Sequence, residues 1–327
     1  MNLWKIYNPD IPPFMQPLTE APAMVRLQHV GMNCGCEYTS FPMFEGLDDS
    51  SRYDHSVGCA LIVWHFTHDV RQAVAALLHD ISTPVFAHVV DFLNGDHLRQ
   101  ESTEDATEKV IANSPELMEA LSGLGVRLEE VSDYHLYPIA DNDTPRLSAD
   151  RLEYTLGNVL NYRLAPWETI QAWYDHLVVG KNEVGEDELM FDDLATAEAF
   201  ALAALHMSRV YVSDEDRYAM QMLAELLRKH LNRGVITHSD LYLTEPEIIS
   251  KLESDALAAH DWQVFRAMRQ MHKGPHPEKS RVIAAKKRYI NPMVRDKGRV
   301  ADLSQTVHED MQRFLENSFD EEIWGWC

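Results

Sequence analysis

The chain has 327 residues, enough for about two ordinary domains or one large helical domain with appendages. Acidic residues number 52 against 29 Lys and Arg, and the resulting net charge of −23 argues against general nucleic-acid or anionic-membrane binding, which needs a basic surface. The composition is that of an ordinary soluble globular protein, and the longest apolar runs are about half the length of a bilayer span.

Helical periodicity dominates the chain and predicts a mainly α fold, since apolar residues recur at spacings of three and four over long stretches. These stretches are residues 52–67, 70–81, 101–113, 148–161, 193–212, 213–232 and 246–271. Residues 37–43 are the best candidate for a strand.

The sequence divides into three expected segments. Residues 1–50 form an irregular N-terminal segment rich in Pro and Gly, residues 51–235 a helical metal-binding core, and residues 236–327 a smaller α-rich region that carries a basic run. The run comprises Lys279, Arg281, Lys286, Lys287, Arg288, Arg295, Lys297 and Arg299. It is either a solvated face or a source of cations that reach an anionic substrate or a neighbouring subunit.

Four cysteines are too few for a disulfide framework in a chain of this length, and the first residues lack the pattern of a secretory signal, so a cytoplasmic protein is expected. Cys34 and Cys36 are separated by one residue and have no second pair, which disfavours a structural zinc site. Their loop, with Gly31 and Gly35, is instead expected to line a pocket.

Of three His-Asp pairs, His79-Asp80 stands out because it ends the apolar helix 73–78, so both side chains reach the edge of a core. A buried imidazole and carboxylate are costly there unless they are paired or bind a cation. His55 and Asp150 each lie near the start of another helical stretch. Two imidazoles and two carboxylates would suit one divalent ion, Mn, Fe, Co, Ni or Zn, with Mg also compatible.

Three ordered motifs carry a family resemblance. They are Arg-Tyr-x-His-Ser-x-Gly at 52–58, Leu-Leu-His-Asp-Ile at 77–81 and Ala-Asp-Arg-Leu-Glu-Tyr at 149–154. Together they resemble the HD-domain metal-dependent phosphohydrolases, closest to the deoxynucleoside triphosphate triphosphohydrolase branch. The resemblance implies an HD-type helical core, His55, His79, Asp80 and Asp150 as metal ligands, and a small phosphorylated substrate, with a nucleotide as the first expectation.

The segment 84–91 resembles the stretch in which that branch places a further histidine. The resemblance implies that His88 contacts phosphate or protonates a leaving oxygen and that Asp91 orients it. A later His-Glu pair supplies catalytic groups in many members, and here Gln100-Glu101 is the nearest counterpart, so either Glu101 acts alone or His97 substitutes.

The chain also departs from the family. It has Ser82-Thr83-Pro84-Val85 where Gly-His-Gly-Pro is usual, so one active-site histidine is absent. Met32 and Asn158 align with positions that read the sugar in dNTP-cleaving relatives. The ligands are therefore retained, while the groups that select the substrate differ.

Three side chains are candidates for substrate binding. Arg52 lies one helical turn before His55 and is expected to bind phosphate, as in the resembled family. Arg151 is either a second phosphate cation or the partner of a nearby acid. Tyr154 follows Asp150 by four residues, on the same helical face, and is expected to stack on the substrate or hydrogen-bond to it.

The predicted function is hydrolysis of a nucleotide or related small phosphate ester through metal-activated water. Two alternatives remain open: a di-iron oxygenase on the same scaffold, with His88, His97 or His135 as extra ligands, and a non-catalytic nucleotide-binding sensor. The resembled branch often assembles symmetrically, so a homo-oligomer is compatible with the sequence.

Overall fold

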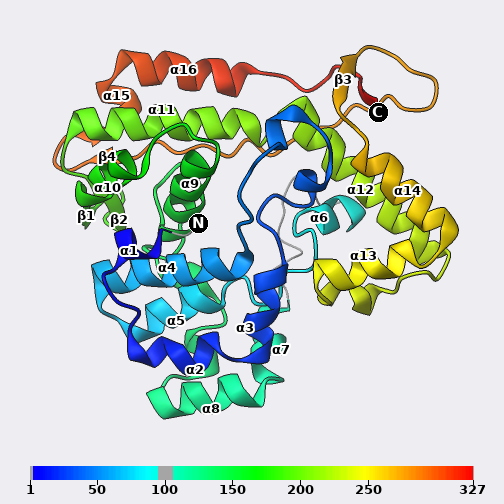
Figure 1. Cartoon of the computed structure of the whole chain (residues 1–327). Coiled ribbons are helices and arrows are strands. Elements are labelled where there is room, and N and C mark those ends of the chain that lie inside the picture. Colours follow the sequence, from blue (N-terminus) through cyan, green and yellow to red (C-terminus); the bar gives the residue numbers. More distant parts are fainter. Residues whose placement is uncertain (1–2, 95–105, 327) are drawn as a thin grey trace.

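The computed structural model describes residues 3–94 and 106–326, and over these ranges it confirms the predicted mainly α fold (Figure 1). The α-helices are α1 (Trp4–Tyr7), α2 (Gln16–Thr19), α3 (Pro22–Arg26), α4 (Arg52–Thr67), α5 (Val70–Leu78), α6 (Val89–Asn94), α7 (Thr107–Ala112), α8 (Pro115–Leu124), α9 (Ala149–Asn161), α10 (Trp167–Asp175), α11 (Leu194–Val210), α12 (Asp214–Asn232), α13 (Glu245–Glu253), α14 (Ala256–Arg266), α15 (Val300–Leu303) and α16 (Gln305–Glu316). Among these described helices, none combines the length and hydropathy needed to cross a bilayer.

Two small sheets complete the described fold. The first contains β1 (Leu177–Lys181), β2 (Asp187–Phe191), β4 (Met293–Val294) and β5 (Gly298–Arg299), in that order. Strands β1 and β2 form a hairpin, and β4 runs parallel to β2. The second sheet pairs β3 (Gln270–Lys273) with β6 (Ile323–Trp326) in antiparallel register. In both sheets a strand from the C-terminal part of the chain pairs with an earlier strand, β4 with β2 and β6 with β3.

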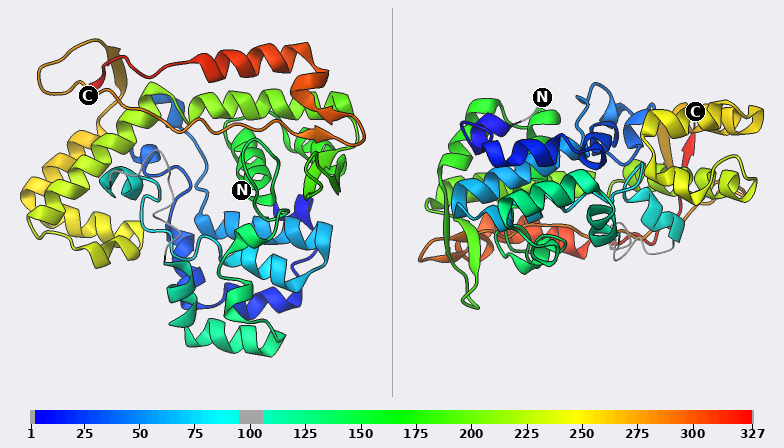
Figure 2. Two further views of the ribbon diagram at one scale, coloured as in Figure 1. Left: turned by 180° about the vertical axis from the view of Figure 1, so that it is seen from behind. Right: turned by 90° about the horizontal axis from the view of Figure 1, so that it is seen from below.

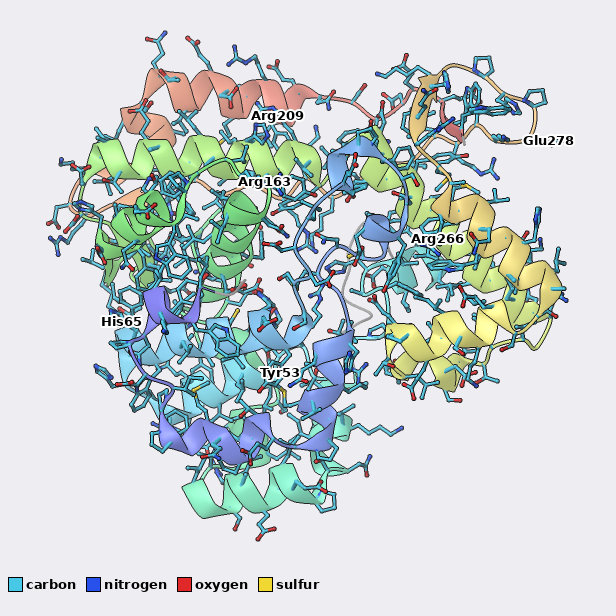
Figure 3. All side chains as sticks on the ribbon, viewed as in Figure 1. Tyr53, His65, Arg163, Arg209, Arg266 and Glu278 are labelled. Carbon is cyan, nitrogen blue, oxygen red and sulfur yellow. The ribbon has the colours of Figure 1, made fainter. Side chains whose placement is uncertain are left out.

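Helices α4 and α5 form an antiparallel hairpin at the centre of the first hydrophobic core. Helix α4 ends at His68, which adopts the left-handed conformation, and Asp69 caps α5 by accepting a hydrogen bond from the Arg71 backbone N–H. This tight turn brings the end of α5 beside the first half of α4. Helix α9 packs across α4, and α11 packs on α9. Arg209 on α11 joins α16 through Asp310, Nη2 to Oδ1 at 2.9 Å (Figure 3).

A second core forms around α12, α13 and α14, and it draws buried residues from the N-terminal segment, from residues 85–92 and from the C-terminal strand β6. An extended stretch, residues 281–292, runs from the β3–β6 pair past α12 and α11 to β4 (Figure 2). The three-segment division of the chain stays a prediction.

Two local predictions are wrong. Residues 37–43 form no strand, because Gly35, at φ 78°, starts a 3₁₀ turn at Cys36–Tyr38 and a second 3₁₀ turn follows at Pro42–Phe44. The helical spacing over 246–271 corresponds to two helices, α13 and α14, and the predicted helical stretch does not extend to its end. Asp255 accepts hydrogen bonds from two backbone N–H groups of the next turn and so starts α14 separately, after which residues 270–273 form β3. The remaining predicted helices appear with ends shifted by a few residues, except that the start of 101–113 lies outside the described residues.

Candidate metal centre and substrate cavity

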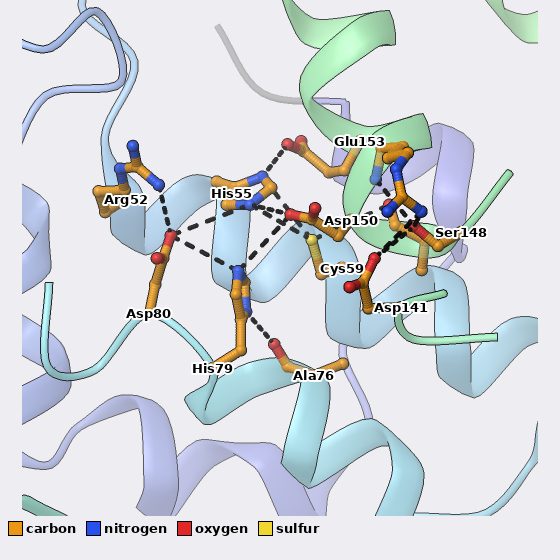
Figure 4. Close-up of polar contacts among 12 residues, drawn as sticks. Arg52, His55, Cys59, Ala76, His79, Asp80, Asp141, Ser148, Asp150 and Glu153 are labelled. Carbon is orange, nitrogen blue, oxygen red and sulfur yellow. Dashed lines mark hydrogen bonds and ion pairs between the residues drawn. The ribbon is translucent and has the colours of Figure 1, made fainter. Parts of the chain in front are cut away.

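Two imidazoles and two carboxylates from three places in the chain meet beside the first core (Figure 4). His55 lies in the first turn of α4, His79 and Asp80 directly follow α5, and Asp150 lies in the first turn of α9. His55 Nε2 is 3.0 Å from Asp150 Oδ1 and 3.9 Å from Asp80 Oδ2. His79 Nε2 is 3.7 Å and 3.5 Å from the same two oxygens. The structure therefore brings all four predicted ligands together.

These separations suit a single ion. Donor atoms at about 2.1 Å from one ion lie roughly 3.0 Å apart in octahedral coordination and roughly 3.4 Å apart in tetrahedral coordination, and the four distances here run from 3.0 to 3.9 Å. Neutral imidazole nitrogens and carboxylate oxygens form a donor set for first-row transition metals. The residues present thus fit a divalent ion, and their role as its ligands stays a prediction.

Both histidine rings are oriented by contacts on the side away from the centre. His79 Nδ1 donates to the backbone carbonyl of Ala76 at 2.7 Å, and His55 Nδ1 donates to Glu153 Oε2 at 2.6 Å. Each contact leaves Nε2 turned toward the centre, which is the arrangement found around histidine ligands in general.

Asp80 is held in the ionised state. Burial raises the pKa of its carboxyl group, but the positive charge of Arg52, the neighbouring imidazoles and the hydrogen bond from Thr83 outweigh burial and hold that pKa well below its usual range. Arg52 Nη1 donates to Oδ2 at 2.9 Å, and Thr83 Oγ1 donates to Oδ1 at 2.7 Å. Thr83 stands where the resembled family usually has a histidine, and it adds a hydrogen bond to Asp80.

A further potential ligand, which the sequence did not suggest, is Cys59 on α4, one turn after His55. Its sulfur lies 3.7 Å from both ring nitrogens of His55. Burial raises the pKa of the Cys59 thiol to about 12.

A cavity of about 820 Å³ opens on the centre, within the size range of small-molecule sites. Its cationic lining consists of Arg52, Arg151, Arg217, Lys286 and Arg288, and its aromatic lining of Phe44, Phe92, Tyr134, Tyr154, Tyr162 and Tyr211. Lys286 and Arg288 belong to the extended stretch 281–292, so part of the basic run does reach the cavity. Other members of the run pair with protein acids, as Arg299 does with Glu188.

His88 faces this cavity from the turn before α6. Its Nδ1 donates to Asp91 Oδ2 at 2.9 Å, as predicted for an orienting aspartate, and its Nε2 accepts from Arg288 Nη2 at 3.3 Å. Burial, reinforced by the charges of Arg288 and Arg52, lowers the pKa of His88 to about 4. His88 is therefore a neutral imidazole in this structure.

The predicted binding residues Arg151 and Tyr154 both line the cavity. The guanidinium of Arg151 is already engaged, since Nη1 lies 3.2 Å from Asp141 Oδ1 and 2.8 Å from Asn142 Oδ1. The Tyr154 ring meets Tyr211 edge to face at 6.0 Å. Tyr211 in turn accepts a hydrogen bond from Asn158 Nδ2 at 2.8 Å, so Asn158, one of the departures from the family pattern, supports the aromatic wall.

Some predicted residues lie outside the described ranges, and two residues at the site had no predicted role. Glu101, His97 and Gln100 lie outside the described residues. Glu153 and Arg288 touch the site although no role was predicted for them individually. The signal for Glu153 was its spacing of three residues from Asp150, whereas nothing in the sequence distinguishes Arg288 from the rest of its basic run.

Comparisons with known proteins find distant relatives of the chain. No family model matches the chain. The uncharacterized protein YdhJ of Bacillus subtilis is 27% identical over 227 residues, covering 68% of this chain and 66% of that protein. The metal-dependent phosphohydrolase cns2 of Cordyceps militaris is 26% identical over 243 residues, covering 71% of this chain and 62% of cns2. The chain thus spans slightly under two thirds of the length of these curated relatives.

Solved structures show the same fold over almost the whole chain. A phosphohydrolase from Bacteroides thetaiotaomicron superposes with a TM-score of 0.66 at 13% identity, covering 97% of this chain and 96% of that one. A hypothetical protein from Aquifex aeolicus gives a TM-score of 0.61 at 18% identity, covering 96% and 92%. The chain therefore shares its fold with a protein described as a phosphohydrolase.

Proposed function

We propose that this protein is an HD-type, metal-dependent phosphohydrolase that cleaves phosphate esters or anhydrides of small molecules. The observation that carries the proposal is the convergence of His55, His79, Asp80 and Asp150 at the floor of a partly cationic cavity. The relative cns2 and the Bacteroides structure, both described as phosphohydrolases, support the same activity class.

A divalent ion bound by these four residues would lower the pKa of a water molecule and polarise a phosphoryl oxygen. Arg52 borders both Asp80 and the cavity, so its guanidinium is placed to bind a phosphate oxygen while it stays paired with Asp80. His88 and Arg288 face the same cavity. A phosphate beside Arg288 would offset that residue's charge and favour a proton on His88 Nε2, which could then pass to the leaving oxygen.

A nucleotide is the substrate class that we favour. Tyr154, Tyr162 and Tyr211 give the cavity an aromatic wall on which a base or sugar can pack, and the volume of about 820 Å³ accommodates a molecule of that size. Met32 and Asn158 also line the cavity, so the two departures from the dNTP-cleaving pattern lie where they would affect substrate choice. Assignment to the dNTP triphosphohydrolase branch stays part of this proposal.

The test is a panel of phosphorylated metabolites, incubated with Mn²⁺, Mg²⁺, Co²⁺ or Ni²⁺ and assayed for released phosphate, with the Asp80→Ala protein as the blank. We expect metal-dependent release by the wild-type protein and none by the blank. Tight nucleotide binding without turnover under every metal would instead favour the sensor alternative.

The di-iron oxygenase alternative receives less support. His135 is exposed and lies 3.0 Å from Asp133 and 3.3 Å from Asp141, and His88 is bound to Asp91 and Arg288. Within residues 3–94 and 106–326, the cluster of candidate metal ligands contains two histidines, His55 and His79, and includes neither His88 nor His135. Two irons per chain together with an ultraviolet charge-transfer band would revive that alternative.

A further inference from the structure

Two motif residues, Gly58 and Glu153, have no role in the mechanism above, yet they meet at the centre. Glu153 follows Asp150 by three residues on α9, so both carboxylates lie on one helical face. Its side chain is only 11% exposed, and Oε2 lies 2.6 Å from His55 Nδ1. The distance is that of a short, charge-assisted hydrogen bond. The fully buried Tyr7 donates to the other carboxylate oxygen at 3.4 Å.

Gly58 lies inside α4, three residues after His55, where glycine costs about 1 kcal/mol relative to alanine. The structure supplies a reason for its presence. A Cβ atom on Gly58 would lie 2.7 Å from both Cγ and Oε1 of Glu153 and 3.0 Å from Cδ. These atoms belong to a buried side chain held at both oxygens, which has little room to shift. The missing side chain is what lets Glu153 cross the α4–α9 interface.

We propose that Glu153 is a positioning residue that fixes the tautomer and the orientation of the His55 ring, and that Gly58 provides the space for it. A carboxylate only accepts hydrogen bonds, so Glu153 keeps a proton on Nδ1, and the contact of Nε2 with Asp150 Oδ1 at 3.0 Å is the one that an ion between them would replace. The negative charge behind the ring also increases the basicity of Nε2. The inference rests on the metal centre of the proposed function.

The first test measures the affinity of the full-length protein for Mn²⁺ by isothermal titration calorimetry, without substrate. Removing an outer-shell partner of a ligating histidine usually weakens metal binding by about 10- to 100-fold. We expect a loss of that size for Glu153→Gln, whose amide keeps the shape of the side chain but not its charge. Gly58→Ala should produce a similar loss although it removes no polar atom.

Two further variants show whether Gly58 acts through Glu153. In a Glu153→Ala background the clash is gone, so adding Gly58→Ala should weaken Mn²⁺ binding no further. The matched control is Gly157→Ala on α9, where an added Cβ meets no atom within 4 Å, and its Mn²⁺ affinity should equal that of the wild type. Circular dichroism checks that each variant is folded.

Nuclear magnetic resonance gives a readout that a merely structural role would not change. With ¹⁵N-labelled histidine, the wild-type protein should show a strongly deshielded Nδ1 proton that disappears in His55→Ala and moves upfield in Glu153→Gln. Unchanged Mn²⁺ affinity in both Glu153→Gln and Gly58→Ala would overturn this inference alone. Failure of the wild-type protein to bind Mn²⁺ would overturn the metal centre of the proposed function as well.

Discussion

The position of the Cys59 sulfur beside the His55 ring bears on whether the centre has two or three kinds of donor atom. The sulfur is 3.7 Å from each ring nitrogen of His55, a van der Waals distance, and the two imidazoles and two carboxylates already supply four donor atoms for an ion. We expect Cys59→Ala to retain Mn²⁺ affinity and to cost about 1 kcal/mol of stability through lost packing. Calorimetry and urea denaturation measure the two effects. A loss of affinity as large as that of Asp80→Asn would make Cys59 a ligand.

The four candidate ligands could be singled out from the sequence because each carries its own local signal. His79 and Asp80 end an apolar helix, and His55 and Asp150 lie in ordered motifs. The contacts around these residues were harder to predict from the sequence. Glu153 stood in a motif without an assigned partner, since the sequence gives no distance to His55. The approach of Arg288 to His88 joins residues 200 positions apart, and no local pattern encodes such a contact.

Capping interactions at the helix starts set the positions of the ligands. Ser148 Oγ accepts a hydrogen bond from the Arg151 backbone N–H and donates to Asp141 Oδ1 at 3.1 Å, which anchors the turn that carries Asp150. Ser148→Ala should cost about 1 kcal/mol in urea denaturation and should also weaken Mn²⁺ binding.

The control is Ser114→Ala, because Ser114 caps α8 by the same kind of contact, and α8 lies at the lower edge of the molecule in Figure 1, away from α9. A comparable loss of stability without a change in Mn²⁺ affinity is expected there. If both variants affected Mn²⁺ binding equally, α9 capping would have no specific part in placing Asp150.

The extended stretch 281–292 brings cations to the cavity from outside the helical core. Lys286 and Arg288 line the cavity, whereas Lys279, from the same basic run, lies over the ring of Trp326 at 4.1 Å. With a substrate found by the phosphate-release panel, Arg288→Ala and Lys286→Ala should each raise KM about tenfold, the worth of one charge-assisted hydrogen bond. Lys279→Ala should leave KM unchanged. Steady-state kinetics on the three variants measures these effects, and an equal KM for all three would contradict the prediction.

Long helices were predictable from periodicity, since α4, α9, α11 and α12 bury long apolar faces. The elements that sequence reasoning missed depend on distant partners. Strand β2 is held between β1 and β4, and β4 begins about a hundred residues after β2. Strand β3 pairs with β6, near the end of the chain. Short strands of this kind have little periodicity of their own, so pairing rather than local pattern defines them.

Buried carboxyl groups that keep their protons in the folded protein make its stability depend on pH. Burial raises the pKa of Asp216, and that of Glu37 beside Glu245, to about 8 in each case. In an unfolded chain such groups titrate near pH 4. Above that pH the folded protein retains protons that the unfolded chain has released, so stability falls as pH rises toward the folded pKa. The pKa of Asp80 is lowered in the folded protein, so Asp80 alters the stability only at acid pH, below the range in which Asp216 and Glu37 act.

Urea denaturation between pH 6.5 and 8.5 should therefore show the free energy of unfolding decreasing as pH rises. A single buried carboxyl group contributes at most about 1.4 kcal/mol per pH unit. Asp216→Asn removes one titrating group while keeping its size, so its slope should be shallower than that of the wild type by up to this amount. Glu129→Gln alters a side chain that is 66% exposed and should reproduce the wild-type slope. Parallel curves for Asp216→Asn and the wild type would mean that Asp216 is already ionised in the folded protein, with Arg217 or solvent compensating its charge.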